Sequence, residues 1–170
     1  SLTTTIEHLN EIVNIQAAKG QAKTHIRFSD SMVIVKNAIS NIISNNKAII
    51  TENFSKQDGI AYVPAYLESI LLNLLTNAIK YKHSDRIPKI HLETGINSDN
   101  KTYLKFSDNG RGIDLEKFGK DVFGMYKTFH YNNDAVGIGL FITKNQVESL
   151  GGTINVESTL DKGTEFTITF

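Results

Sequence analysis

The sequence contains no cysteine among its 170 residues. Disulfide bonds and thiolate metal sites are therefore excluded, and the composition is compatible with a reducing compartment. The sequence also lacks a charge excess, because Lys plus Arg and Asp plus Glu both number 18. With no overall field to hold nucleic acid or an anionic membrane, any anion must be bound locally. No apolar run reaches about 18 residues and no signal-peptide pattern opens the sequence, so we expect no direct membrane contact by this segment.

The length suits one domain of full size plus an appended element. Residues 2–18 repeat apolar side chains at alternating steps of four and three, which is the spacing of a helix that packs along a partner helix. We expect this segment to be cut from a larger helical hairpin. His8 lies on it, and two interpretations stay open: a phosphoacceptor imidazole, or a half-exposed histidine beside the seam, since no acidic residue directly follows it.

Residues 64–82 are predicted to form one central helix, which Pro64 is able to open. Its apolar residues cover more than half of the circumference, so most of the helix is expected to be buried. They are Leu67, Ile70, Leu71, Leu72, Leu74, Leu75, Ala78 and Ile79. A narrow polar stripe remains on the other side. It consists of Tyr66, Ser69, Asn73, Asn77 and Lys80.

Asparagine costs about 0.6 kcal/mol against alanine inside a helix, so Asn73 and Asn77 oppose local propensity. Such exceptions in a well-formed element indicate a functional site, and two amide oxygens with the ammonium of Lys80 suit a cation and a phosphate chain. The alternative is a buried amide network that hydrogen-bonds neighbouring backbone.

Patterning predicts further elements on both sides of this helix. They are a short strand at 25–28, a helix capped by Ser29 or Asp30 and running to about Asn45, a strand from Lys47, a hairpin of 89–96 with 101–107, a helix after Gly139, and a closing hairpin that ends at Phe170.

Two glycine motifs stand between these elements. Asp108 begins the sequence DNGRGI, in which Gly110 and Gly112 allow positive φ and a close approach of ligand to backbone. A carboxylate at a strand end accepts a hydrogen bond from an amine such as the exocyclic amino group of adenine. A common Asx turn is the alternative. Further on, Gly137 and Gly139 precede a helix, and free N–H groups at a helix start bind phosphate.

The segment from Asp114 to Ala135 has no clear periodicity, and a loop of this length in a small domain is often a lid. Lys127 and His130 are its candidates for reaching a phosphate, although His130 alone is more typical of a solvent-facing residue.

In order, LLNLLTNAIKY, DNGRGI, DVFGMYKTF, VGIGLFITK and GTEFTITF resemble the N, G1, F, G2 and last glycine boxes of sensor histidine kinases. The resemblance implies a Bergerat-type ATP-binding domain over 21–170, with 1–20 as the end of the second helix of the dimerisation hairpin. It also implies the fold class, a two-layer α/β sandwich in which a mixed, mostly antiparallel sheet carries helices on one face and a long ATP lid.

The resemblance further implies the ligands, ATP and Mg²⁺. Asn77 would ligate the metal, Asn73 would lie near metal and phosphates, and Lys80 would bind the phosphate chain. Catalytic roles would fall to Asn73 and to Lys127, which replaces a lid arginine and keeps the charge but loses the planar fork. The remaining nucleotide-binding residues carried over by position are Tyr81 and Asp108 at the adenine, Gly110, Gly112 and Ile113 along the base pocket, Gly137, Ile138, Gly139 and Leu140 on the phosphate side, and Thr164 at the floor.

Two departures from the family qualify this reading. Ala135-Val136 replace a frequent Gly-Thr, and none of the five histidines has the acidic neighbour of the phosphoacceptor motif. We therefore expect an ATP:protein-histidine phosphotransferase domain that acts on a hairpin histidine, with a homodimeric parent, a response-regulator receiver domain as partner and a cytoplasmic location. Two other interpretations stay open: a nucleotide-sensing module without phosphotransfer, and a clamp-type ATPase of the same fold.

Overall fold

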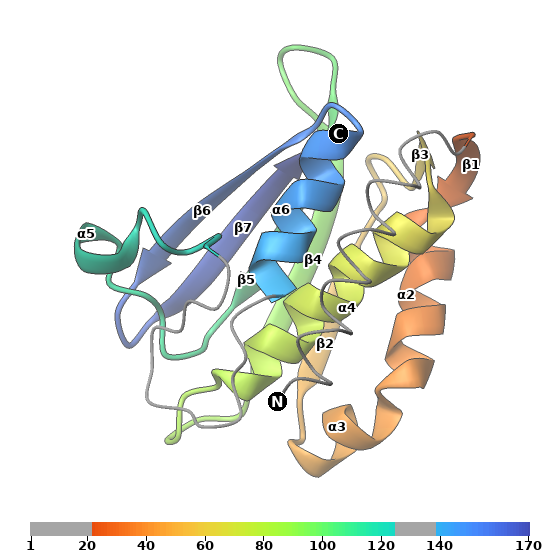
Figure 1. Ribbon diagram of the computed structural model, residues 1–170. Helices are drawn as coiled ribbons and strands as arrows, with labels where there is room; N and C mark the ends of the chain where they lie inside the picture. The colour runs from red at the N-terminus through yellow and green to blue at the C-terminus, as the bar shows by residue number, and fades with distance from the viewer. Residues whose placement is uncertain (1–21, 125–138) are drawn as a thin grey trace, which may run out of the picture.

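The computed structural model describes residues 22–124 and 139–170. Figure 1 shows two layers, in which the long helices cover one face of a twisted sheet. The sheet has five strands in the order β2-β4-β5-β7-β6, and β1 pairs with β3 in a separate two-stranded sheet. Strands β2 and β4 are parallel, whereas all other neighbours are antiparallel. The predicted α/β sandwich with a mixed, mostly antiparallel sheet is thereby confirmed.

The elements follow the sequence pattern closely. The strands are β1 (Thr24–Arg27), β2 (Ile49–Asn53), β3 (Gly59–Tyr62), β4 (Lys89–Ile96), β5 (Thr102–Asp108), β6 (Thr153–Thr159) and β7 (Gly163–Thr169). The helices are α2 (Phe28–Ala38), α3 (Ser40–Asn45), α4 (Pro64–Lys80), α5 (Leu115–Phe118) and α6 (Gly139–Ser149).

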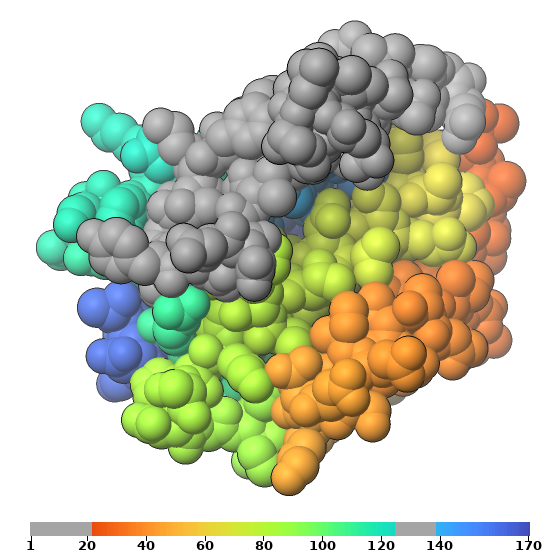
Figure 2. All heavy atoms as spheres, turned by 60° about the horizontal axis from the view of Figure 1, so that its bottom comes forward, coloured from red at the N-terminus to blue at the C-terminus, as the bar shows by residue number. Residues whose placement is uncertain are grey.

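Helix α4 lies at the centre of the helical layer, between α2 and α6 (Figure 1). Its leucines at 67, 71 and 75 are fully buried, and the sheet supplies Leu92, Leu104 and Ile168 to the same core. Each such side chain stabilises the fold by about 1.5–3 kcal/mol through burial alone. Figure 2 shows the solvent-facing part of α4 beside α2 and α3, which are coloured orange. The core therefore fixes which face of α4 remains for a site.

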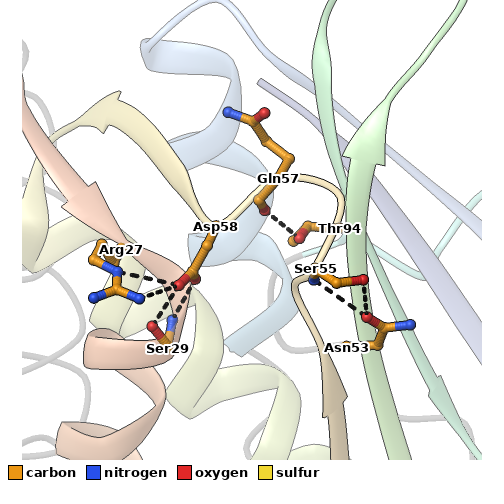
Figure 3. Close-up of polar contacts among 7 residues, drawn as sticks. All are labelled: Arg27, Ser29, Asn53, Ser55, Gln57, Asp58 and Thr94. Carbon is orange, nitrogen blue, oxygen red and sulfur yellow. Dashed lines mark hydrogen bonds and ion pairs between the residues drawn. The ribbon is translucent and has the colours of Figure 1, made fainter.

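The first turn of α2 is capped from a distant part of the chain. The backbone N–H of Ser29 donates to Asp58 Oδ1 at 3.0 Å, and the Ser29 hydroxyl donates to Asp58 Oδ2 at 2.7 Å. Arg27 adds an ion pair to the same carboxylate at 2.9 Å, and Figure 3 shows both side chains directed at Asp58. The expectation that Ser29 or Asp30 would cap this helix was wrong, because Asp58 supplies the cap across 29 positions of sequence.

Two further expectations were wrong. The helix expected to reach Asn45 breaks at Ile39 into α2 and α3, within a sequence rich in serine and asparagine, whose side chains compete for backbone hydrogen bonds. Strand β3 was not predicted, because its four residues are too few for a clear alternation and end only two positions before Pro64. Its Ile60 and Tyr62 are buried, and its partner is β1.

Among the described residues, no helix has the length and apolar character needed to cross a membrane. The predicted hairpin helix at 2–18 with His8, and residues 125–135 of the predicted lid, lie outside the described part of the chain.

Candidate functional site

Asn73 and Asn77 lie where α4 meets the start of α6. A Cβ atom added to Gly139, the first residue of α6, would lie 3.7 Å from Asn73 Oδ1 and 3.8 Å from Asn77 Nδ2. The Asn73 amide N–H donates to the Gly139 carbonyl and to the Thr143 hydroxyl, each at 3.4 Å. Both amides are only partly buried. Asn73 and Asn77 therefore both lie beside Gly139. The Asn73 contacts also agree in part with the alternative interpretation, an amide network to backbone.

The N-terminal half of the polar stripe contacts helix α6. Gln146 Nε2 donates to the Ser69 hydroxyl at 2.9 Å, and the Tyr66 phenol hydrogen-bonds Ser149. Both pairs join α4 to α6, and Tyr66 is only 4% exposed. Tyr66, a member of the predicted stripe, is therefore buried at the contact between the two helices. The stripe therefore has two parts. The first part contacts α6, and the second part, from Asn73 onward, lies at the candidate site.

Within residues 22–124 and 139–170, the Asn77 side chain makes no hydrogen bond, so its amide oxygen is available to a ligand. Lys80 is exposed in the last turn of α4, three residues further on. Amide oxygen and ammonium thus stand on the same side of the helix, at the spacing of positions i and i+3. This pair is suited to a hydrated cation and a phosphate.

Asp108 ends β5 and forms the second part of the site. Its Oδ1 accepts from the Gly110 backbone N–H at 2.8 Å, and the Thr164 backbone N–H also donates to the carboxylate. Burial raises the pKa of Asp108 from 3.8 to about 6, and these two hydrogen bonds oppose the rise without cancelling it. A carboxylate that lacks water gains from a ligand N–H donor.

Backbone packing explains the glycines near Asp108. Gly112 has φ +70, and a Cβ there would lie 2.1 Å from the Thr159 carbonyl oxygen. Gly110 does not have positive φ, contrary to expectation, but a Cβ there would lie 2.8 Å from the Tyr81 carbonyl oxygen and 2.9 Å from Asp108 Oδ1. Gly110 is therefore required by close approach, whereas Gly112 is required by both close approach and backbone conformation.

Ser158 is a site-supporting residue that the sequence did not reveal. Its hydroxyl accepts from the Ile113 backbone N–H at 2.8 Å, donates to the Gly163 carbonyl at 2.9 Å, and lies 2.8 Å from the Thr164 hydroxyl. Ile113 and Thr164 are both buried. The register of the closing hairpin, which pairs Ser158 with Thr164, was the available signal.

Tyr81 follows α4 and is half-buried on the same side. Burial raises the pKa of its phenol, and the Arg111 guanidinium, 5.9 Å from the ring centroid, opposes that rise. Leu140 packs against the core from the first turn of α6. The structure therefore brings together most of the predicted residues. Lys127, Gly137 and Ile138 lie outside the described residues, so their roles stay predictions.

Residues 62–170 match the family described as histidine kinase-, DNA gyrase B- and HSP90-like ATPase. The sensor protein BceS of Halalkalibacterium halodurans is 39% identical over 109 residues, which cover 62% of this chain and 31% of that protein. The autoinducer 2 sensor kinase/phosphatase LuxQ of Vibrio parahaemolyticus is 29% identical over 184 residues, which cover 96% of this chain and 21% of that protein. The chain thus spans only about a fifth to a third of these relatives.

Solved structures agree on the fold. The Acinetobacter baumannii histidine kinase AdeS superposes with a TM-score of 0.77 at 20% identity, covering 99% of this chain and 77% of that one. Full-length ShkA in complex with AMPPNP superposes with a TM-score of 0.75 at 20% identity, covering 98% of this chain and 35% of that one. At this level of identity the likeness concerns the fold.

Proposed function

Because the chain belongs to the histidine kinase-, DNA gyrase B- and HSP90-like ATPase family, we propose that it is the ATP-binding catalytic domain of a two-component sensor histidine kinase. The observation that carries the proposal is the meeting of Asn73 and Asn77 with Gly139. The partly buried carboxylate of Asp108 is linked to the end of the same helix, because Gly110 and Arg111 contact the Tyr81 carbonyl. One end of this arrangement suits a metal-bound phosphate chain, and the other suits a purine with an amino group.

Mg²⁺ fits the amide end. The described residues contain no group of three or more His, Asp or Glu side chains placed to hold a metal ion. Amide and phosphate oxygens are ligands that a hard cation accepts. We propose Asn77 as the metal ligand, Asn73 beside metal and phosphates, and Lys80 on the phosphate chain. A bound Mg²⁺ would supply charge neutralisation at the phosphates, and these residues would hold the phosphate chain in line for transfer. Lys127, Gly137, Ile138 and Leu140 complete the proposed phosphate side.

The base end follows from Asp108. Its carboxylate accepts the exocyclic amino group of adenine, whereas guanine and hypoxanthine present an oxygen at that place. Tyr81 borders the base, and Thr164 forms the floor through its backbone N–H to Asp108. Gly110, Gly112 and Ile113 line the pocket. The proposed substrate is therefore ATP rather than GTP.

The phosphate acceptor is proposed to be a histidine of the dimerisation hairpin, with residues 1–20 as the end of that hairpin and 21–170 as the catalytic domain. A homodimeric parent protein, a response-regulator receiver domain as the next acceptor and a cytoplasmic location belong to the same proposal. Relatives named as sensor proteins and a sensor kinase support it.

The test is Mg²⁺-dependent nucleotide binding by the Asn77→Ala variant. We expect the wild-type chain to bind ADP in a titration calorimeter only when Mg²⁺ is present. The variant should lose at least about tenfold in affinity, because a ligand oxygen is removed from the cation.

The matched control is Asn41→Ala, which removes an exposed amide from α3. Thermal melts should show both variants folded. Unchanged affinity in Asn77→Ala, or no ADP binding by the wild-type chain, would contradict the proposed function.

A further inference from the structure

The loop between α4 and β4 contains Arg86, which has no role in the proposed function. Arg86 Nε donates to the Asn109 carbonyl at 2.6 Å, and its Nη2 donates to the carbonyls of Gly110 at 3.0 Å and Asp161 at 2.5 Å. Asn109 and Gly110 directly follow Asp108, and Asp161 lies in the turn between β6 and β7. One guanidinium therefore joins two segments that are about 50 residues apart in sequence.

Backbone hydrogen bonds link the same segments. The Arg111 N–H donates to the Tyr81 carbonyl at 3.0 Å, and the Asp161 N–H donates to the Arg111 carbonyl at 2.7 Å. The residues 108–112, which we call the base loop, thus lie between the end of α4 and the β6–β7 turn. In Figure 2 the green atoms after α4 and the blue atoms of the last strands lie at one corner of the molecule.

The far side of the base loop is held by Asn109. Its Nδ2 donates to the Ile87 carbonyl at 3.0 Å, and its Oδ1 accepts from the Lys89 N–H at 2.8 Å. The loop that carries Arg86 is consequently tied to the base loop at both of its ends. Arg86 hydrogen-bonds the carbonyls of Asn109, Gly110 and Asp161.

The chemistry of the three acceptors favours arginine at this position. The planar guanidinium presents N–H groups in fixed directions, so it serves several carbonyls at once, whereas a lysine ammonium is a single compact donor group. A carbonyl that loses its donor either takes water or moves. Replacing Arg86 therefore frees the base loop to shift.

Such a shift acts on Asp108 through one peptide unit. The Gly110 N–H orients Asp108 Oδ1, while the Gly110 carbonyl is held by Arg86. Gly163 closes the other side, since a Cβ there would lie 1.9 Å from the Asp108 carbonyl oxygen. The carboxylate direction therefore depends on where Arg86 holds the base loop.

We propose that Arg86 is a positioning residue that sets base selectivity by fixing the base loop around Asp108. This inference rests on the proposed function. Arg86 itself does not contact the base. Its removal should weaken recognition of the adenine amino group and leave contacts to the phosphates in place.

The experiment measures calorimetric affinities for Mg²⁺-ADP and Mg²⁺-IDP in wild type, Arg86→Met and Arg86→Lys. IDP differs from ADP in carrying an oxygen in place of the amino group. We expect the ADP-to-IDP affinity ratio to fall about tenfold in Arg86→Met, since one charge-assisted hydrogen bond loses its geometry. Arg86→Lys should fall between the two, because one donor group remains.

Arg27→Met is the matched control. It removes another exposed arginine and its ion pair, at the opposite end of α4 from the base loop (Figure 1). Its ratio should equal that of wild type, even where its melting temperature falls. A merely structural role for Arg86 would lower both affinities alike.

A ratio within twofold of wild type in the Arg86 variants would overturn the inference while leaving the proposed function intact. Should Arg86→Met fail to fold, the ratio of Arg86→Lys decides. A wild-type chain that binds ADP no better than IDP would overturn the proposed base site, and with it the inference.

Discussion

Asp108→Asn should stabilise the nucleotide-free chain at neutral pH. The carboxylate of Asp108 is partly buried, and desolvation raises its pKa from 3.8 to about 6. At 1.36 kcal/mol per pKa unit, this shift corresponds to about 3 kcal/mol of unfavourable free energy in the folded state. Asparagine has nearly the same shape as the protonated acid and carries no charge, so the substitution removes that cost.

The sign of the pH dependence follows from the raised pKa. The stability contributed by protonated Asp108 is fully present below pH 3.8 and is lost as the pH rises through about 6. The variant and the wild type should therefore be equally stable near pH 4, and the variant should gain progressively up to about 3 kcal/mol at pH 8. Every other titrating group is common to both chains and cancels in the difference.

Urea unfolding at pH 4, 6 and 8 measures this difference in the free energy of unfolding. A variant-minus-wild-type difference that stays constant across these pH values would refute the assignment of Asp108 as a desolvated carboxylate. The same variant should bind ADP more weakly at pH 8, because the amide presents a donor where the carboxylate is proposed to accept the adenine amino group. A substitution that raises stability and weakens binding is expected at a residue whose role is ligand recognition.

Two further substitutions test contacts away from the amide end. Asp58→Asn should cost about 1 kcal/mol at pH 7, as expected for a lost helix cap. Burial raises the pKa of Asp58, but the hydrogen bonds from Ser29 and Arg27 outweigh it and lower the pKa, so this cost should shrink as the pH falls below 3.8; a cost independent of pH in urea unfolding would argue against it. Gly163→Ala should cost more than Gly151→Ala, since both have positive φ but only the Cβ at 163 meets backbone; equal unfolding free energies would contradict this reading.

The parts of the fold that depend on local pattern were predicted well. Strand β4 was predicted at 89–96 and is found at Lys89–Ile96, because its alternation is strict and its turn residues are clear. The α2 cap was not found, because its acceptor, Asp58, comes from a distant loop. Strand β3 was too short to show a period. Errors therefore concentrate where long-range pairing decides the local structure.

In the candidate site too, local sequence reveals some residues and long-range contacts bring in others. Asn73 and Asn77 became candidates because they oppose helix propensity, and Asp108 because it begins a glycine motif at a strand end. Ser158 and Arg86 act through backbone atoms of other segments, and nothing in their immediate sequence distinguishes them from ordinary surface residues. Only the hairpin register and the loop geometry bring them to the site.

The place where α6 begins decides how the polar stripe of α4 is used. Tyr66, Ser69 and Asn73 each face a residue of α6, so these polar groups join two helices. Helix α6 starts at Gly139, level with Asn73 and Asn77, so beyond that point α4 has no α6 residue to pair with. Asn77 is partly buried at this boundary, and Lys80 is exposed one turn further along α4. One continuous stripe therefore forms a packing surface at one end and the proposed ligand-binding surface at the other, and the boundary between them is the N-terminus of α6.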